Sequence, residues 1–274
     1  MGREQEEDSG SAILTSMERQ KPKKSLGQHF LASQSAVKAI IDAAALTKTD
    51  TVLEIGPGEG VLTEALLEKA GRVIAVEKDH RLHSFLSERF ARELRQSAFI
   101  LQEGDILELS PKALGLKDGT FKVAANIPYY LTGALIRRLL ESREQPSSMV
   151  LLLQKEVAER IARSKKESIL SISVKAYGDP RYVRTVPAAV FWPKPKVNSA
   201  ILAIENISRR RFRGLSEKHF FGVLRAGFAK KRKKLLSNLS AIAPKQRVAE
   251  AFAALSLPEN MRAEDLSTEG WFAL

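Results

Sequence analysis

The sequence contains no cysteine, and this absence removes several kinds of chemistry at once. Disulfide bonds, cysteine-bound zinc and thiolate nucleophiles are all excluded. Histidine is scarce as well: the four histidines stand at positions 29, 80, 83 and 219, a spacing that does not match a set of metal ligands. We therefore expect no metal site.

Long hydrophobic runs are also missing. The strongest short run, Met149 to Leu153, is far below the roughly 20 residues that span a membrane. The N-terminus shows no secretory signal pattern, so a cytoplasmic protein with no membrane partner is expected. Residues 1–20 begin with a mostly acidic and polar stretch, and we predict that they form a disordered tail.

Positive charge is abundant and unevenly placed in this chain, whose net charge is +12. Residues 206–240 contain eleven Lys or Arg and a single acid, Glu217. A smaller cluster, which comprises Arg19, Lys21, Lys23 and Lys24, precedes the first predicted helix. Concentrated basic charge is typical of a protein that binds a polyanion, although a solvated basic face gives the same pattern.

The 274 residues, 44% of them hydrophobic, suit one large domain or a large domain with a small one. Alternating apolar runs and helical patterns predict an α/β domain over residues 21–205. Its strands are predicted at 51–55, 72–77, 98–101, 121–125, 147–153, 182–186 and 197–205, with a helix at 79–94 and an ambiguous segment at 168–177. From residue 206 the chain is basic, and helices are predicted at 217–228, 230–239, 245–255 and 264–272.

A glycine-rich turn, residues 56–60, joins the first predicted strand to a helix that begins at Val61. Such a turn lets a ligand approach the backbone, and the helix N-terminus offers free N–H groups. Glu77 ends the next strand, where nucleoside-binding proteins place the acid that binds ribose hydroxyls. The glycines do not follow the Gly-x-Gly-x-x-Gly spacing of dinucleotide-binding oxidoreductases, so a smaller ligand without a pyrophosphate is favoured. Asp105, after the third strand, could accept a hydrogen bond from an adenine amine or merely cap a turn.

A second turn, Asn126-Ile127-Pro128-Tyr129, lies between the strand at 121–125 and a predicted helix at 131–140. The asparagine oxygen and a carbonyl beside the proline can accept both N–H groups of an exocyclic amine. Pro128 fixes the direction of that carbonyl, and Tyr129 offers a flat face to a base. Taken alone, these four residues are more typical of an ordinary turn.

Phe191 and Trp192 precede a segment that contains Pro193 and Pro195. The two prolines forbid a helix and stiffen this loop. The aromatic pair could form a base clamp together with Tyr129, in which rings on two sides hold a nucleobase. It could equally be a hydrophobic plug, apolar side chains that cover the edge of the sheet, and the pattern favours neither.

Together these motifs resemble the ribosomal RNA adenine N6-dimethyltransferases that modify small-subunit RNA. The resemblance runs from about residue 21 to the end and is carried by residues 23–31 (KKSLGQHFL), 53–60 (LEIGPGEG), 126–130 (NIPYY), 154–161 (QKEVAERI), 191–199 (FWPKPKVNS) and 227–236 (GFAKKRKKLL). It implies a Rossmann-like class I methyltransferase sheet with helices on both faces, plus a small C-terminal all-helical domain. It also implies S-adenosylmethionine as the cofactor.

Carried over to this chain, the resemblance implies transfer of methyl groups to N6 of two adjacent adenines, each dimethylated, by a monomer acting within an assembling 30S-type subunit. His29 and Tyr130 stand where many members have asparagine. The implied cofactor-binding residues are His29, Leu31, Gly56, Gly58, Glu77, Asp105 and Asn126. The expected catalytic residues are Asn126, Pro128, Tyr129 and Phe191. The basic residues expected to bind RNA are Lys23, Lys24, Arg225, Lys230, Lys231, Arg232, Lys233 and Lys234.

Three other functions fit parts of the pattern. The Lys-Pro-Lys at 194–196 also resembles the 23S RNA methyltransferases that confer macrolide resistance, although residues 154–161 and the basic C-terminal segment favour the small-subunit enzymes. A DNA adenine methyltransferase would use the same asparagine turn. A non-catalytic RNA-binding assembly factor on the same fold is a further alternative. Such a factor would not need an intact Asn126 turn or Glu77, so the presence of both argues against it. A cytosine C5 enzyme is excluded by the missing cysteine.

Overall fold

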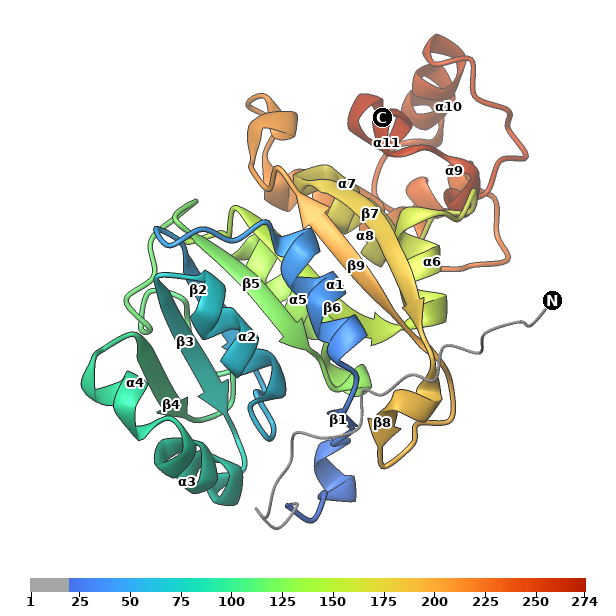
Figure 1. Cartoon of the computed structure of the whole chain (residues 1–274). Coiled ribbons are helices and arrows are strands. Elements are labelled where there is room, and N and C mark those ends of the chain that lie inside the picture. Colours follow the sequence, from blue (N-terminus) through green and yellow to red (C-terminus); the bar gives the residue numbers. More distant parts are fainter. Residues whose placement is uncertain (1–19) are drawn as a thin grey trace, which may run out of the picture.

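The computed structural model describes residues 20–274, and its centre is a seven-stranded sheet (Figure 1). The strand order is β4-β3-β2-β5-β6-β9-β7, parallel from β4 to β6, with β9 and β7 antiparallel to their neighbours. The strands are β2 (Thr51–Ile55), β3 (Arg72–Glu77), β4 (Phe99–Glu103), β5 (Phe121–Asn126), β6 (Ser148–Gln154), β7 (Asp179–Val186) and β9 (Ser199–Glu205). A separate two-stranded sheet pairs β1 (Phe30–Leu31) with β8 (Phe191–Trp192). The tail predicted for residues 1–20 lies outside the described residues, except for Gln20.

Both faces of the large sheet are buried because its strands carry apolar residues at consecutive positions, which point to opposite sides. In β2, for example, Val52 packs into one apolar cluster and Leu53 into the other. The helices α1 (Gln34–Ala44), α2 (Val61–Lys69) and α3 (His80–Arg89) contribute to the Val52 cluster. The helices α5 (Thr132–Glu141), α6 (Lys155–Ala162) and α7 (Ile169–Tyr177) contribute to the Leu53 cluster. The predicted fold class, with helices on both faces, is confirmed.

Within residues 21–205, the structure decides one ambiguous segment and contradicts one predicted helix. The ambiguous segment 168–177 is the helix α7, which begins where Ser168 accepts a hydrogen bond from the backbone N–H of Ser171. The single helix predicted for 79–94 is wrong: it breaks at Phe90 into α3 and the short α4 (Ala91–Arg95). The described residues contain no helix long and apolar enough to span a membrane.

The C-terminal part is all-helical, with α8 (Glu217–Gly227), α9 (Leu235–Leu239), α10 (Lys245–Ala254) and α11 (Thr268–Ala273). In Figure 1 these helices lie at the end of the sheet remote from β1 and β8. They share an aromatic cluster with the sheet domain, in which the Tyr177 ring on α7 packs on Phe212 and Phe221. The Tyr177 hydroxyl donates to Glu217 at 2.5 Å, which ties α7 to α8.

The helix predicted for residues 230–239 is wrong in its first half. Residues 230–234 form a turn, and the helix α9 starts only at Leu235. Five consecutive cations in a helix would place like charges three and four residues apart, which destabilises a helix. The turn is held instead by Asn238, whose side-chain amide donates to the carbonyls of Gly227 and Lys230 at 2.6 and 3.2 Å.

Candidate active site

A cavity opens at the carboxyl ends of β2, β3 and β5, where the strand order reverses between β2 and β5. This crevice is where open α/β sheets bind ligands. Separate stretches of the chain come together around it. They are residues 26–31, 54–59, 61–62, 76–78, 104–106 and 126–131, with Leu82 from α3 and Phe191 from β8.

The glycine-rich turn after β2 forms the floor of the cavity. Gly56 and Gly58 both have a positive φ, of 63° and 62°, a conformation that favours glycine. A Cβ atom at Gly56 would meet nothing within 4 Å, so its backbone faces open space. A Cβ atom at Gly58 would lie 3.1 Å from the Phe30 ring, so the turn also needs glycine to pack against β1. A ligand can therefore reach the backbone at Gly56.

Two carboxyl groups stand on adjacent strands beside this turn. Glu77, which ends β3, is 5% exposed and accepts hydrogen bonds from the backbone N–H groups of Asp79 and Gly58, at 2.8 and 3.4 Å. Burial raises the pKa of Glu77, although these two bonds oppose the shift. Glu54 on β2 is 1% exposed and accepts from the Thr63 hydroxyl at 2.7 Å. Burial, reinforced by the charge of Glu77, raises the pKa of Glu54 to about 8.

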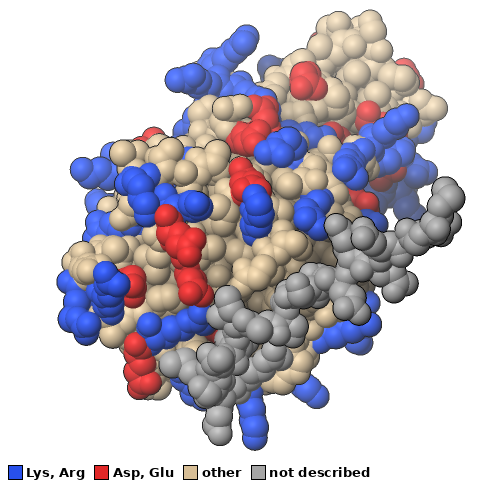
Figure 2. All heavy atoms as spheres, viewed as in Figure 1, with Lys and Arg blue, Asp and Glu red and all other residues tan. Residues whose placement is uncertain are grey.

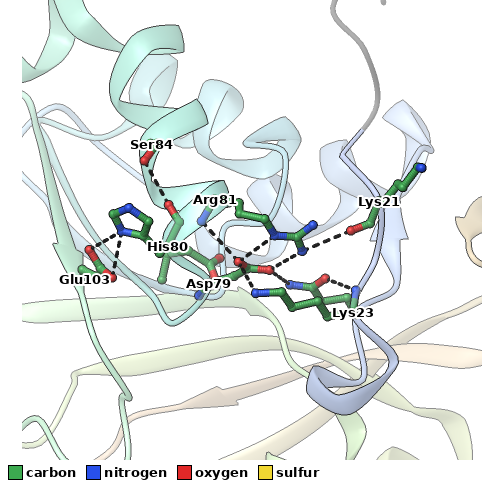
Figure 3. A network of polar contacts seen from close by, with 9 residues as sticks. Lys21, Lys23, Asp79, His80, Arg81, Ser84 and Glu103 are labelled. Atoms are coloured by element: carbon green, nitrogen blue, oxygen red, sulfur yellow. Dashed lines mark hydrogen bonds and ion pairs between the residues drawn. The ribbon is translucent and has the colours of Figure 1, made fainter.

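Asp79 ties the N-terminal strap, defined here as residues 20–31, to the cavity (Figure 3). Its carboxylate is fully buried, and it accepts from Lys23 at 2.9 Å, from Gln28 at 3.2 Å and from Arg81 at 2.8 Å. Burial alone would raise the pKa of Asp79, but the bonds from Arg81, Lys23 and Gln28 outweigh it and hold the pKa well below the usual range. Arg81 also donates to the carbonyl of Lys21 at 3.2 Å, so the strap is fastened at several points.

The predicted asparagine turn faces the cavity. The Asn126 side-chain nitrogen donates to the backbone carbonyl of His29 in the strap at 3.0 Å. Because a carbonyl can pair only with the NH₂ end of the amide, this bond fixes which end of the side chain is which. The side-chain oxygen of Asn126 is thereby left for a ligand in the cavity.

The backbone carbonyls of the same turn are used unequally. The Pro128 carbonyl accepts from the Leu131 N–H at 2.9 Å. Within residues 20–274, no donor pairs with the carbonyl of Ile127. The turn therefore carries two acceptors that its own hydrogen bonds leave free, the Asn126 oxygen and the Ile127 carbonyl.

The rings of Tyr129, His29 and Phe191 line the cavity beside this turn. The Tyr129 hydroxyl shares a 2.8 Å hydrogen bond with Ser199 on β9, and burial raises the pKa of Tyr129. The Tyr129 ring stacks on His29, with 5.8 Å between centroids. His29 in turn uses Nδ1 for the carbonyl of Pro193 at 2.6 Å, so Nδ1 must carry the proton. Phe191 is 4% exposed and pairs with Leu31 across β1 and β8, so it lies in a short strand rather than in the proline loop itself.

Asp105 lies at the rim of the cavity with both carboxylate oxygens engaged. One accepts from Lys78 at 2.7 Å and the other from the backbone N–H of Leu107 at 2.9 Å. The Lys78 ammonium holds the pKa of Asp105 below its usual value. Asp105 thus caps its own turn, one of the two roles that the sequence left open, while it still lines the cavity.

The basic residues divide into paired and exposed side chains. Lys23 pairs with Asp79, Arg209 with Glu217, and Arg211 with Asp179. On the face shown in Figure 2, lysine and arginine side chains project at many points and acidic ones lie among them. The side chains of Lys24, Arg225, Lys230, Lys231, Arg232, Lys233 and Lys234 are exposed.

Within residues 20–274 there is no group of three or more His, Asp or Glu that could hold a metal ion.

Sequence reasoning missed two residues that organise the cavity. Asp79 precedes a helix and resembles an ordinary N-cap, but the cations at positions 21, 23 and 24 were a signal that the strap needs a buried acidic partner. Ser199 ends the 191–199 motif, and no local pattern shows that its hydroxyl meets Tyr129, which is 70 residues away in the chain.

The seven-stranded sheet with helices on both faces is the fold of class I methyltransferases, and solved structures share it. A solved structure of the 23S rRNA methyltransferase ErmE matches 89% of this chain and 97% of its own, with 24% identity and a TM-score of 0.73. A dimethyladenosine transferase from Plasmodium falciparum matches 89% of this chain and 95% of its own, with 27% identity and a TM-score of 0.74.

The particular family follows from the sequence comparisons. A family model described as ribosomal RNA adenine dimethylase matches residues 19–274, and the chain belongs to this family. The chain is 43% identical over 254 residues to the ribosomal RNA small subunit methyltransferase A of Dehalococcoides mccartyi strain CBDB1, which covers 92% of this chain and 86% of the relative. The resemblance found from the motifs is confirmed.

Proposed function

We propose that this protein transfers methyl groups from S-adenosylmethionine to N6 of two adjacent adenines in small-subunit ribosomal RNA, dimethylating each. The observation that carries the proposal is the Asn126 turn, whose two free acceptors match the two N–H groups of an adenine amine. Membership of the adenine dimethylase family supports the same reaction. We expect a monomer that acts in the cytoplasm on an assembling small subunit.

The residues of the cavity fit the cofactor. The open backbone at Gly56 admits a ligand, and Glu77 keeps acceptor capacity for a pair of ribose hydroxyls because its present bonds come from two N–H groups. His29, Leu31, Gly58 and Asp105 complete the proposed cofactor site, since all four line the same cavity. When bound, S-adenosylmethionine supplies a methyl group that is already activated, so neither a metal nor an enzyme nucleophile has to be supplied.

The protein must make the adenine amine nucleophilic and hold it in line. The amine is a poor nucleophile because its lone pair is delocalised into the ring. The Asn126 oxygen and the Ile127 carbonyl accept hydrogen bonds from its two N–H groups, and Pro128 fixes the direction of that carbonyl. These bonds favour tetrahedral geometry at N6 and free its lone pair. Tyr129 and Phe191 hold the flipped base by stacking.

The two parts of the chain divide the work in this proposal. Residues 21–205 bind the cofactor and carry out the transfer, and residues 206–274 bind RNA. Lys24, Arg225 and the cations of residues 230–234 are exposed and point to phosphate contacts. Lys23 is also assigned to RNA, although its ammonium pairs with Asp79 at 2.9 Å.

The direct test is methyl transfer with radiolabelled cofactor. The purified protein is offered small-subunit RNA, assembling small subunits, large-subunit RNA and DNA, and the labelled adenosines are separated by their number of methyl groups. We expect N6,N6-dimethyladenosine from the small-subunit substrates. Label in large-subunit RNA alone would assign the chain to the macrolide-resistance type, and label in no substrate would make it a non-catalytic binding factor.

A substitution tests the role of the turn in the same assay. Asn126→Ala removes one acceptor for the reacting amine, and we expect turnover to fall by about 10²-fold or more. Calorimetry should show that affinity for S-adenosylmethionine changes far less, because the side chain is assigned to the amine. Turnover close to that of the unaltered protein would refute the mechanism.

A further inference from the structure

Exposed aromatic side chains stand next to the rings of the proposed base clamp. Tyr130 directly follows Tyr129 and is 59% exposed, and Trp192 directly follows Phe191 and is 39% exposed. In each pair the first ring lines the cavity and the second ring opens to solvent. The same inner-and-outer arrangement thus occurs on two elements far apart in the sequence.

Tyr130 is held in a defined place despite its exposure. It lies in the short 3-10 turn η2 (Tyr129–Leu131) and lines the cavity mouth. A Cβ atom on Gly27 of the strap would lie 3.2 Å from both Cδ1 and Cε1 of the Tyr130 ring, so that edge of the ring rests on the strap backbone. A ring supported at one edge and open elsewhere can accept a flat partner with little loss of side-chain freedom.

The substrate of the proposed function supplies such a partner. A flipped adenine remains covalently joined to its two neighbours, so one neighbouring base must pass the mouth of the cavity. Stacking on an aromatic side chain is the usual way in which proteins hold an unpaired base. We propose that Tyr130 is a stacking platform for the nucleobase next to the target adenine.

This inference rests on the proposed function and makes it more specific. If the targets are two adjacent adenines, a platform on one fixed side of the target holds the other adenine while one of the two is methylated. Tyr130 would then favour a purine beside the target and hold the second acceptor close to the site. Trp192 differs from Tyr130, because its ring packs on Phe30 with 6.3 Å between centroids.

Four proteins, the unaltered chain and the variants Tyr130→Ala, Tyr130→Leu and Tyr130→Phe, test the platform in the methyl-transfer assay. We expect Tyr130→Ala to raise KM for RNA about 10-fold, as for one missing base–aromatic stack. Tyr130→Phe keeps the aromatic face and should retain the original KM, whereas Tyr130→Leu keeps apolar volume without that face and should remain impaired. Melting temperature and cofactor affinity should not change, because the ring is exposed and outside the proposed cofactor site.

A second substrate separates stacking from any other effect of the substitution. Ribosomal RNA is prepared with an abasic nucleotide on the 5′ or the 3′ side of one target adenine. On one of these two substrates the unaltered protein should lose about as much as Tyr130→Ala loses on intact RNA, and Tyr130→Ala should lose nothing more. Equal losses for Tyr130→Ala on intact RNA and on both abasic RNAs would overturn the platform, as would an unchanged KM. If the unaltered protein methylates no RNA, the proposed function has failed instead.

Discussion

At the scale of single residues, the electrostatic field in the cavity depends on which of two buried carboxyl groups, Glu54 or Glu77, is ionised. Glu54 and Glu77 stand on adjacent strands, and their mutual repulsion makes it costly to ionise both. Glu77 receives two backbone N–H bonds, whereas Glu54 receives one hydroxyl and is fully enclosed. Burial therefore favours the neutral form of Glu54 at neutral pH, whereas the backbone N–H bonds to Glu77 favour its charged form, and we assign Glu77 to the cofactor ribose.

This arrangement predicts an unusual pH dependence of stability. The pKa of Glu54 is about 8 in the folded protein against 4.5 as its ordinary value, so the folded state holds a proton that the unfolded state has released between these pH values. Stability contributed by this proton is present below about pH 4.5 and is lost as the pH rises to about 8.

Glu54→Gln removes the titration but keeps an acceptor for Thr63. We expect its free energy of unfolding, relative to the unaltered protein, to improve by several kcal/mol between about pH 5 and about pH 9, since each tenfold change in proton affinity is worth about 1.4 kcal/mol. Urea unfolding at both pH values measures this difference. Glu68→Gln, on the exposed side of α2, controls for the loss of a surface carboxylate. A pH-independent difference for Glu54→Gln would contradict the prediction.

Phe191 has features of both roles that the sequence left open, since it belongs to an apolar cluster and also lines the cavity. If it holds the target base, Phe191→Leu should lower the methylation rate about 10-fold while melting almost normally, because leucine keeps most of the volume but has no aromatic face. Phe99→Leu, in the same cluster but away from the cavity, is the matched control and should methylate normally. Normal methylation by Phe191→Leu would remove this residue from the site.

At the scale of elements, the strap is the part that joins the cofactor side of the cavity to the adenine side. Asp79 holds its first half, and the carbonyl of His29 holds the amide of Asn126. Asp79 also donates its backbone N–H to Glu77. A substitution at Asp79 should therefore affect both the cofactor site and the catalytic turn.

Asp79→Asn tests this connection. The variant leaves Lys23 and Arg81 without a countercharge, so the strap should open more often. We expect trypsin to cleave after the lysines of the strap about 10-fold faster, and KM for S-adenosylmethionine to rise. Because the pKa of Asp79 lies below 3.8, the stabilisation is complete at neutral pH and is lost as the pH falls below about 4. Asp42→Asn, an exposed carboxylate paired with Lys38, should change none of these, and equal cleavage of all three proteins would argue against a strap held by Asp79.

The elements also show how far the sequence could predict the structure. The strand β2 is predictable from its consecutive apolar residues, and the helix α6 from apolar residues that recur at helical spacing. The motif positions alone predict that Glu77, Asn126 and Tyr129 belong to one site. The partners Asp79–Lys23 and Tyr129–Ser199 could not be predicted, because they depend on how distant segments pack. The helix predicted over the basic run at 230–234 is wrong since helical spacing takes no account of the repulsion between like charges.

At the scale of the whole molecule, the basic residues of the C-terminal segment differ in whether an acidic side chain lies next to them. Two cations of the C-terminal segment form ion pairs, Arg209 with Glu217 and Arg211 with Asp179. The turn at 230–234 instead exposes five cations in sequence and pairs with no acid among residues 20–274. We therefore expect RNA phosphates to be attracted most strongly to this turn, in a protein whose net charge is +12.

The salt dependence of RNA binding tests this expectation directly. Binding releases counterions in proportion to the phosphates neutralised, so the slope of log affinity against log salt reports how many phosphates the protein binds. Replacing Lys230, Lys231, Arg232 and Lys233 with glutamine should reduce the slope by ~0.7–0.9 for each phosphate that is no longer bound. A matched control removes the same charge at the amino ends of the parallel strands, opposite the cavity, by replacing Lys48, Lys69, Arg72 and Lys117 with glutamine. If net charge alone drives binding, both variants will weaken it equally and leave similar slopes; if the turn binds phosphates, only the first variant will flatten the slope.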